Sequence, residues 1–218
     1  MSQQERTIKI TTQEEQLWEN LTISNSFIFE KVIQNPELCK EMLERLMDIP
    51  VEHIEYPNDS KNKCLHVYLR NSKETMCYVV IQLINNGTPA QLSQRVRYYQ
   101  EAIDLEAFAQ GISYDELPNS YVVVVCTFDV FGLDLQKYTF ENKCKENNVS
   151  LNDGTAIVFF NTSGAKGDIS KDTENILKFI EDNAVRDDFT ERLAQEVQKI
   201  KKEQEYQIEY MALQLYNS

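Results

Sequence analysis

The sequence predicts an α/β fold in which helices flank a mixed central sheet, and three observations predict it. The run 121–128, YVVVVCTF, is continuously apolar, which is typical of a strand buried on both faces. Residues 90–109 repeat apolar side chains every three or four positions and indicate a long helix before that strand, with Leu92, Val96, Tyr99, Ile103 and Ala107 on its inner face. Two strand-like segments, 63–70 and 76–84, precede the helix and are separated by the polar turn NSKE. This order combines a hairpin with a parallel crossover in one sheet.

The chain before the hairpin is expected to begin with helices. Residues 13–20 indicate a short helix with Leu17 and Trp18 pointing inward. A second helix is expected to begin at Ser24 or Asn25. The run that follows, SFIFEKVIQ, repeats its apolar residues at helical rather than alternate spacing, so helix is favoured over strand.

A third helix and three further strands complete the sheet and its surroundings. Pro36 suits a first helical turn, and residues 48–50 end the apolar face that follows it. The segment 51–56 is rich in β-favouring residues and adds a strand before the hairpin. Beyond the buried strand, 137–144 and 156–161 predict two more strands.

The C-terminal part is expected to be helical. A helix is predicted over residues 173–183, and the last thirty residues predict one amphipathic helix without a strict heptad repeat. The chain therefore divides into a helical lead-in at 1–20, a central domain at 21–185 and a C-terminal helix at 186–218. The apolar stripe of that helix consists of Phe189, Leu193, Val197, Ile200, Ile208, Met211 and Leu215.

Composition bounds the compartment and the partners. The net charge of −13 opposes nonspecific DNA binding, which depends on Lys and Arg to release counterions from phosphates. No run approaches the roughly 18 apolar residues of a membrane span, so no membrane partner is expected. The scattered cysteines show no zinc-ligand spacing and favour a reducing, cytoplasmic setting. They are Cys39, Cys64, Cys77, Cys126 and Cys144.

Alternation along the hairpin brings one set of residues to a shared face of the sheet. In the first strand, the side chain of His66 is expected on the face opposite to that of Leu65 and Val67. In the second strand Val80 and Gln82 share a face. If the strands pair as neighbours, His66 is expected to lie near Val80 and Gln82.

Four blocks of the sequence follow one another in a recognisable order: SNSFIFEKVIQNPELCKEMLERL, RVRYYQEAIDLE, PNSYVVVVCTFDVFG and YTFENKCKE. In this order they resemble the PD-(D/E)XK nuclease family transposases, also called recombination-promoting nucleases. The first two blocks resemble the family's opening Asn-Asp-Phe-x-Phe helix with its Asn-Pro-Glu, and its Arg-x-Arg-Tyr-Tyr-Gln helix; the other two resemble its late strands. The likeness extends from about Leu21 to the C-terminal helix. It implies a restriction-endonuclease-like core and a metal-dependent DNA endonuclease.

The departures from the family pattern fall where the resemblance places the catalytic acids. Ser26 stands at the N-terminal acid, His66 at the hairpin aspartate and Val80 at the glutamate of Glu-x-Gln, of which Gln82 alone matches. Magnesium requires hard oxygen ligands, and valine offers none. No intact catalytic site, no metal and no cofactor are therefore expected. Magnesium would be expected only if a carboxylate site had been rebuilt.

Three further acidic residues could supply the carboxylates of such a rebuilt site. Glu30 lies one helical turn after Ser26, and Glu101 lies with Asp104 on the helix after the hairpin. The alternative function is thus an active magnesium-dependent endonuclease with a relocated carboxylate.

The leading hypothesis is a transposase-like protein that has lost catalysis and acts by binding DNA or protein. Arg95 and Arg97 are the candidates for phosphate contact, although arginine stems also support helix packing. A third hypothesis is an acidic interaction protein that pairs with active relatives. In that case the C-terminal helix at 186–218 would form a homo-oligomer or a mixed oligomer.

Overall fold

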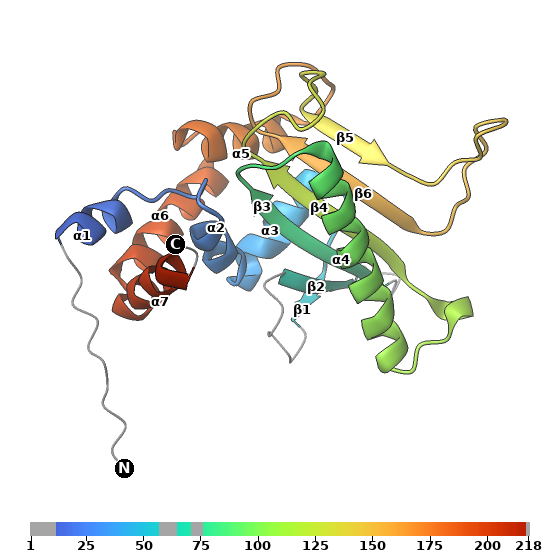
Figure 1. The fold of residues 1–218 in the computed structure, drawn as a ribbon, viewed down its shortest axis with the longest axis horizontal. Coiled ribbons are helices and arrows are strands. Elements are labelled where there is room, and N and C mark those ends of the chain that lie inside the picture. Colours follow the sequence, from blue (N-terminus) through green and yellow to red (C-terminus); the bar gives the residue numbers. More distant parts are fainter. Residues whose placement is uncertain (1–11, 57–64, 71–75, 217–218) are drawn as a thin grey trace, which may run out of the picture.

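A computed structural model describes residues 12–56, 65–70 and 76–216. Its centre is a six-stranded mixed sheet in the order β1-β2-β3-β4-β6-β5 (Figure 1). Strands β1, β2 and β3 pair antiparallel, β3, β4 and β6 pair parallel, and β5 pairs antiparallel with β6. The α/β class and the mixed sheet flanked by helices are confirmed. The strands are β1 (His53–Glu55), β2 (Leu65–Arg70), β3 (Met76–Ile84), β4 (Asn119–Cys126), β5 (Lys137–Phe140) and β6 (Thr155–Asn161).

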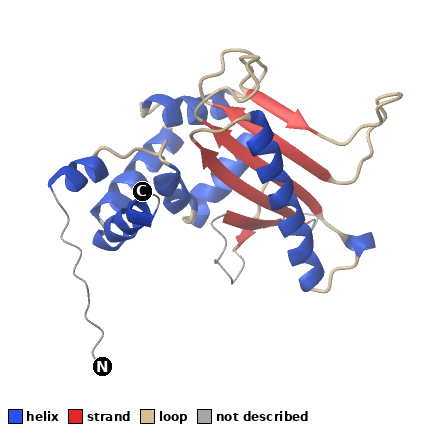
Figure 2. Cartoon of the chain, viewed as in Figure 1, coloured by secondary structure: helices blue, strands red, loops and turns tan. Residues whose placement is uncertain are grey.

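Helices cover both faces of this sheet and divide the core into two clusters (Figure 2). One face of β3 and β4, with Val79 and Val123, packs against helices from both ends of the chain. The opposite face, with Val80 and Val122, packs under α4 alone among the helices of the described chain. The helices are α1 (Thr12–Glu19), α2 (Ser26–Ile33), α3 (Pro36–Met47), α4 (Pro89–Ala109), the 3₁₀ turn η1 (Tyr114–Glu116), α5 (Lys171–Asp182), α6 (Asp188–Lys202) and α7 (Gln204–Tyr216).

Local signals set the helix starts as expected. Asn25 caps α2, because its side chain accepts a hydrogen bond from the Phe27 amide at 3.0 Å. Asn35 caps α3 immediately before Pro36. Asp48 ends α3 in the left-handed region, with φ 54°. The long helix α4 buries the five predicted positions of its inner face, Leu92, Val96, Tyr99, Ile103 and Ala107.

The predicted single C-terminal helix is wrong, because the structure has two helices there. Glu203 adopts extended backbone, with φ −81° and ψ 109°, and separates α6 from α7. A non-helical residue interrupts the 3.6-residue period, so the apolar stripe cannot continue on the same side. As a result Ile208 and Leu215 are exposed, whereas Met211 of α7 and the α6 part of the stripe are buried in the core. Leu17, expected to point inward, is also exposed.

The two ends of the described chain pack together. Trp18 of α1 is buried and donates a hydrogen bond from Nε1 to the Lys201 carbonyl at 2.9 Å, at the end of α6. Its ring also packs against Phe27 and Tyr210. The carbonyls at a helix C-terminus lack intrahelical partners, so the indole supplies one of them with a donor. The lead-in, as far as the structure describes it, is therefore part of the same folded body.

An ionic cluster centred on Arg45 joins α3, α5 and α6. The Arg45 guanidinium lies 2.7 Å from a Glu41 carboxylate oxygen and 2.9 Å from an Asp187 oxygen. It also stacks on the Phe189 ring at 4.7 Å. Asp187 caps α6 by accepting a hydrogen bond from the Thr190 amide at 2.8 Å. One carboxylate thus both starts a helix and pairs with a cation on another.

No helix within the described ranges is long and apolar enough to span a bilayer.

Two of the expected strands are shorter than predicted, since β1 covers His53–Glu55 and β5 stops at Phe140. The first eleven residues, Cys64 and the predicted NSKE turn lie outside the described residues.

Candidate functional site

The strand register brings together the hairpin positions that the sequence singled out. His66 lies directly opposite Val80 in the antiparallel ladder between β2 and β3. Val80 faces α4, so the predicted shared face is the one that α4 covers. The side chain of His66 lies outside the described residues, and its placement here is that of the backbone alone.

Val80 is fully buried in an apolar cluster. None of its surface is exposed, and it belongs to the cluster formed by α4 and the central strands, with Val96, Tyr99 and Val122. A carboxylate here would lose its hydration, and the described side chains of the cluster offer it no cation, which is unfavourable. A magnesium ion needs oxygen ligands, typically carboxylates, and water around it. The described side chains of the cluster around Val80 include no carboxylate to hold one.

Gln82, the one position that matches the family motif, is part of a polar chain that runs out to solvent. The Tyr99 hydroxyl donates a hydrogen bond to Gln82 Oε1 at 2.5 Å. The Arg95 Nε in turn donates to the Tyr99 hydroxyl at 2.5 Å, and its guanidinium lies 5.7 Å from the centre of that ring. Arg95 thus supports Tyr99 from outside, in the packing role that its long stem permits.

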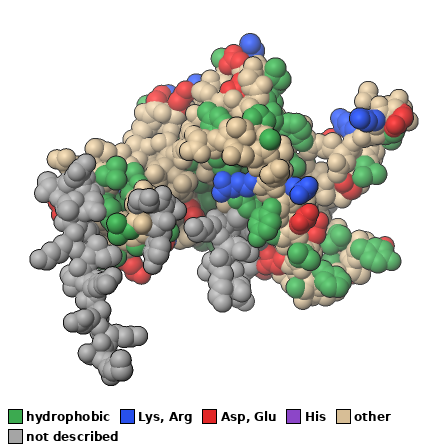
Figure 3. Space-filling model, viewed as in Figure 1, with side chains coloured by type: hydrophobic (Ala, Val, Ile, Leu, Met, Phe, Trp, Pro, Cys, Tyr) green, Lys and Arg blue, Asp and Glu red, His purple; other side chains and the backbone are tan. Residues whose placement is uncertain are grey.

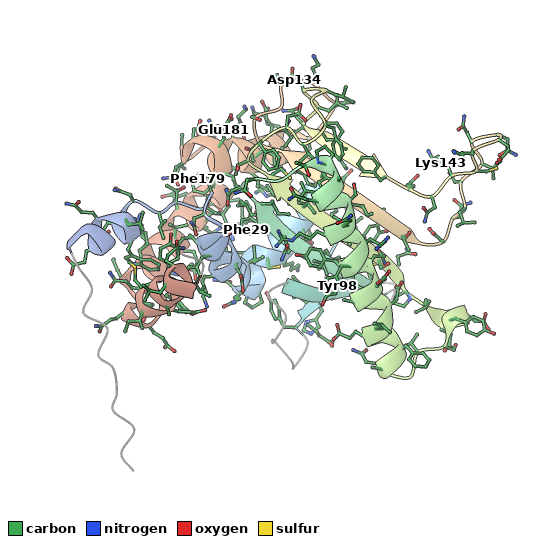
Figure 4. The ribbon with its side chains drawn as sticks, in the orientation of Figure 1. Phe29, Tyr98, Asp134, Lys143, Phe179 and Glu181 are labelled. Atoms are coloured by element: carbon green, nitrogen blue, oxygen red, sulfur yellow. The ribbon has the colours of Figure 1, made fainter. Side chains whose placement is uncertain are left out.

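Arg97 and Tyr98 point away from the sheet. The Arg97 side chain is 77% exposed, and its Nε lies 4.0 Å from a Glu101 carboxylate oxygen one turn along the helix. Tyr98 is 61% exposed and projects from the outer side of α4 (Figure 4). The structure therefore separates the two arginines, since Arg95 bonds to Tyr99 whereas Arg97 lies at the surface.

Ser26 lies at the first turn of α2 and is exposed. Helix α2 begins near the carboxyl end of β3, because Asn85 just beyond that strand donates a hydrogen bond to the Ser24 carbonyl at 2.7 Å. Asn85 also bonds the Thr127 hydroxyl, just after β4, at 3.2 Å. Asn85 therefore links the start of α2 to the carboxyl ends of β3 and β4, the end of β3 at which Gln82 lies.

The acids proposed for a rebuilt site lie on opposite sides of the sheet. Glu30 is on α2, which packs with Val79 and Ile81 on one face. Glu101 is on α4, over the other face, and is exposed beside Arg97. Asp104 follows on α4, and burial raises the pKa of its carboxyl despite a hydrogen bond from Gln100. Across the described ranges, no group of three or more His, Cys, Asp and Glu residues is arranged to hold a metal ion.

A second feature of α4 was not predicted from the sequence. Beside its C-terminal half lies an open, mainly apolar cavity of about 690 Å³, lined by Leu105, Phe108, Ile112 and Leu117 among others. Figure 3 shows hydrophobic side chains gathered over this end of α4 and η1. The signal that could have found it is a second apolar spacing on the helix, at Tyr98, Ala102 and Leu105.

Comparison of the chain with protein-family models, with curated proteins and with solved structures found no match.

Proposed function

We propose that this chain is a transposase-like relative of the PD-(D/E)XK nucleases that has lost catalysis and acts by binding another protein. The resemblance of its four sequence blocks motivates the family, and the order of hairpin, crossover helix and parallel strand agrees with the core that the resemblance implies. The burial of Val80 is the observation that supports the loss of catalysis. A position that would hold a metal-binding carboxylate is filled by an apolar side chain inside a packed cluster.

Purified protein with Mg²⁺ or Mn²⁺ is expected to leave supercoiled plasmid intact, because losing metal activation of water and phosphate removes most of the rate of such an enzyme. Gel electrophoresis of the plasmid measures this, and titration calorimetry with each metal measures binding. The matched controls are Glu30→Gln and Glu101→Gln. Cleavage that either substitution abolishes would show an active site rebuilt from these acids. Cleavage that neither substitution changes would be traced by repeating the assay across separated chromatographic fractions, and activity that follows the protein would also contradict the proposal.

Protein binding is favoured over DNA binding on two grounds. The net charge of −13 repels a polyanion, and Arg95 is bonded to Tyr99 on the protein itself. The alternative rests on Arg97, whose side chain is largely exposed.

At physiological salt we expect no measurable binding of duplex DNA, as followed by fluorescence anisotropy of a labelled oligonucleotide. The control is Arg97→Ala. Binding that weakens as salt rises and that is lost in this variant would favour the DNA-binding alternative, because phosphate contacts carry that salt dependence.

A further inference from the structure

Helix α4 has two apolar sides, and one of them faces solvent. The inner side packs on the sheet through the buried positions already described. The outer side carries Tyr98, Leu105 and Phe108, which are 61%, 69% and 75% exposed, with Ala102 between them. These four positions are spaced by three or four residues and so form one stripe. A helix that is apolar on both sides is typical of one with a partner on each.

An apolar cavity lies beside this outer stripe, so the surface has both protruding side chains and a hollow. Leu105 and Phe108 line one wall and residues around η1, including Tyr114, line the other. Glu101 and Asp104 also contribute to the lining. A large aromatic ring offered by a partner could therefore fill the hollow, and aromatic residues of this kind are enriched among the strongest contributors to protein interfaces.

Charge is distributed unevenly along the same helix. Arg95 and Arg97 lie in its N-terminal half, whereas Glu101, Asp104 and Glu106 lie in its C-terminal half. In a two-fold dimer, residue i of one copy meets residue j of the other, and j meets i. When the axis crosses the helix, the two helices run antiparallel. Each basic half then lies against the acidic half of the other copy, so the surface is complementary to itself.

We propose that two copies of this chain pair through the outer side of α4, about a two-fold axis near Glu101 and Ala102. In this register Tyr98 of each copy lies opposite Leu105 of the second copy and its ring enters the cavity there. Arg97 lies beside Asp104 of the second copy, because the two-fold axis brings the same flank of each helix together and Arg97 and Asp104 share a flank.

This inference rests on the proposed function, because it identifies the protein that is bound as a second copy of this chain. It depends on the outer surface of α4 and not on the state of the nuclease-like site. The two are therefore tested separately, since plasmid cleavage would overturn the loss of catalysis and leave the dimer standing. It also differs from pairing through the C-terminal helix, whose α6 stripe is buried within the chain.

Sedimentation equilibrium of the full chain tests the proposal directly. A contact along about 15 Å of one helix, from Tyr98 to Phe108, is small, so we expect dissociation on the order of micromolar and visible dimer between about 1 and 300 µM. Tyr98→Ala and Leu105→Glu should each weaken the dimer by about a hundredfold, because each contact is made twice. The matched control is Leu151→Glu, which changes a residue of similar exposure, 67%, in the distant segment between β5 and β6.

Charge reversal tests the register. Arg97→Glu and Asp104→Lys should each weaken pairing by about tenfold, and the two together should restore it, because the doubled ion pair is then re-formed with reversed signs. Glu101→Gln should strengthen pairing, since it removes two like charges beside the axis. Circular dichroism melting of every variant checks that the fold is retained.

Four outcomes would overturn the proposal. One is a monomer at every concentration, and another is a dimer that Tyr98→Ala and Leu105→Glu leave unchanged. The third is a dimer that the two charge reversals together weaken further instead of restoring, which would contradict the stated register. A dimer lost equally in Leu151→Glu would place the contact elsewhere and would count against α4 in the same way.

Discussion

Replacing Val80 by glutamate is expected to destabilise the protein by about 3 to 5 kcal/mol without creating a metal site. The side chain has no exposed surface and lies in an apolar cluster of described residues, so the carboxyl must either stay protonated or be buried as a charge. Urea unfolding of the variant and of the original chain at pH 7 measures the difference. The matched control is Val80→Ala, which removes apolar contacts alone and should cost about 2 kcal/mol.

The pH dependence of Val80→Glu should identify burial of the carboxyl as the cause. Burial raises the pKa of the carboxyl in the folded state above its unfolded value of about 4.3, so the folded state binds the extra proton. Stability relative to Val80→Ala should therefore fall as pH rises from about 4. A melting temperature that rises on adding Mn²⁺ to the variant carrying both Val80→Glu and His66→Asp would contradict the closed, apolar site.

Removing the Asp187 carboxylate is expected to cost about 3 kcal/mol. Asp187→Ala deletes the cap of α6 and leaves Arg45 without one of its two nearest acidic partners, while Asn175 loses an acceptor at 2.9 Å. Urea unfolding measures the loss. The matched control is Asp188→Ala, one residue along, because Asp188 is largely exposed and pairs at the surface with Arg192. Equal losses in the two variants would contradict the central role of Asp187.

The same carboxylate should make stability sensitive to acid. Burial alone would raise the pKa of Asp187, but hydrogen bonds from Thr190, Asn175 and Arg45 outweigh it and lower the pKa to about 2. A folded-state pKa below the unfolded value of about 3.9 gives stability that is present above pH 4 and is lost as pH falls through about 2. Asp187→Asn should therefore flatten the fall in unfolding free energy between pH 4 and pH 2, by about 2 kcal/mol.

The central elements of the fold follow from local patterns because those patterns report burial. The apolar run of β4 and the inner positions of α4 are specified residue by residue. Alternation along the hairpin predicted that His66 lies near Val80 and Gln82, and the register places it directly opposite Val80. The order of the outer strands was not predictable in this way. Strand β6 lies between β4 and β5, which is a choice among distant pairings that no local period records.

The candidate site was predictable only in part, for a related reason. Periodicity identified Tyr99 as a buried position, but not that its hydroxyl reaches Gln82 on the strand below. That contact depends on how α4 crosses the sheet, which is a tertiary property. Likewise the apolar stripe at the C-terminus gave no sign of the break at Glu203, because glutamate is itself a good helix former.

The buried indole of Trp18 gives the molecule a built-in optical reporter. It is the only tryptophan in the chain, and its ring lies between the start of α2 and α7 while its nitrogen bonds the end of α6. Its emission spectrum therefore responds to whether the N-terminal and C-terminal helices are docked, rather than to the hairpin or to α4 directly. Intrinsic fluorescence followed beside circular dichroism would resolve detachment of these terminal helices from melting of the sheet.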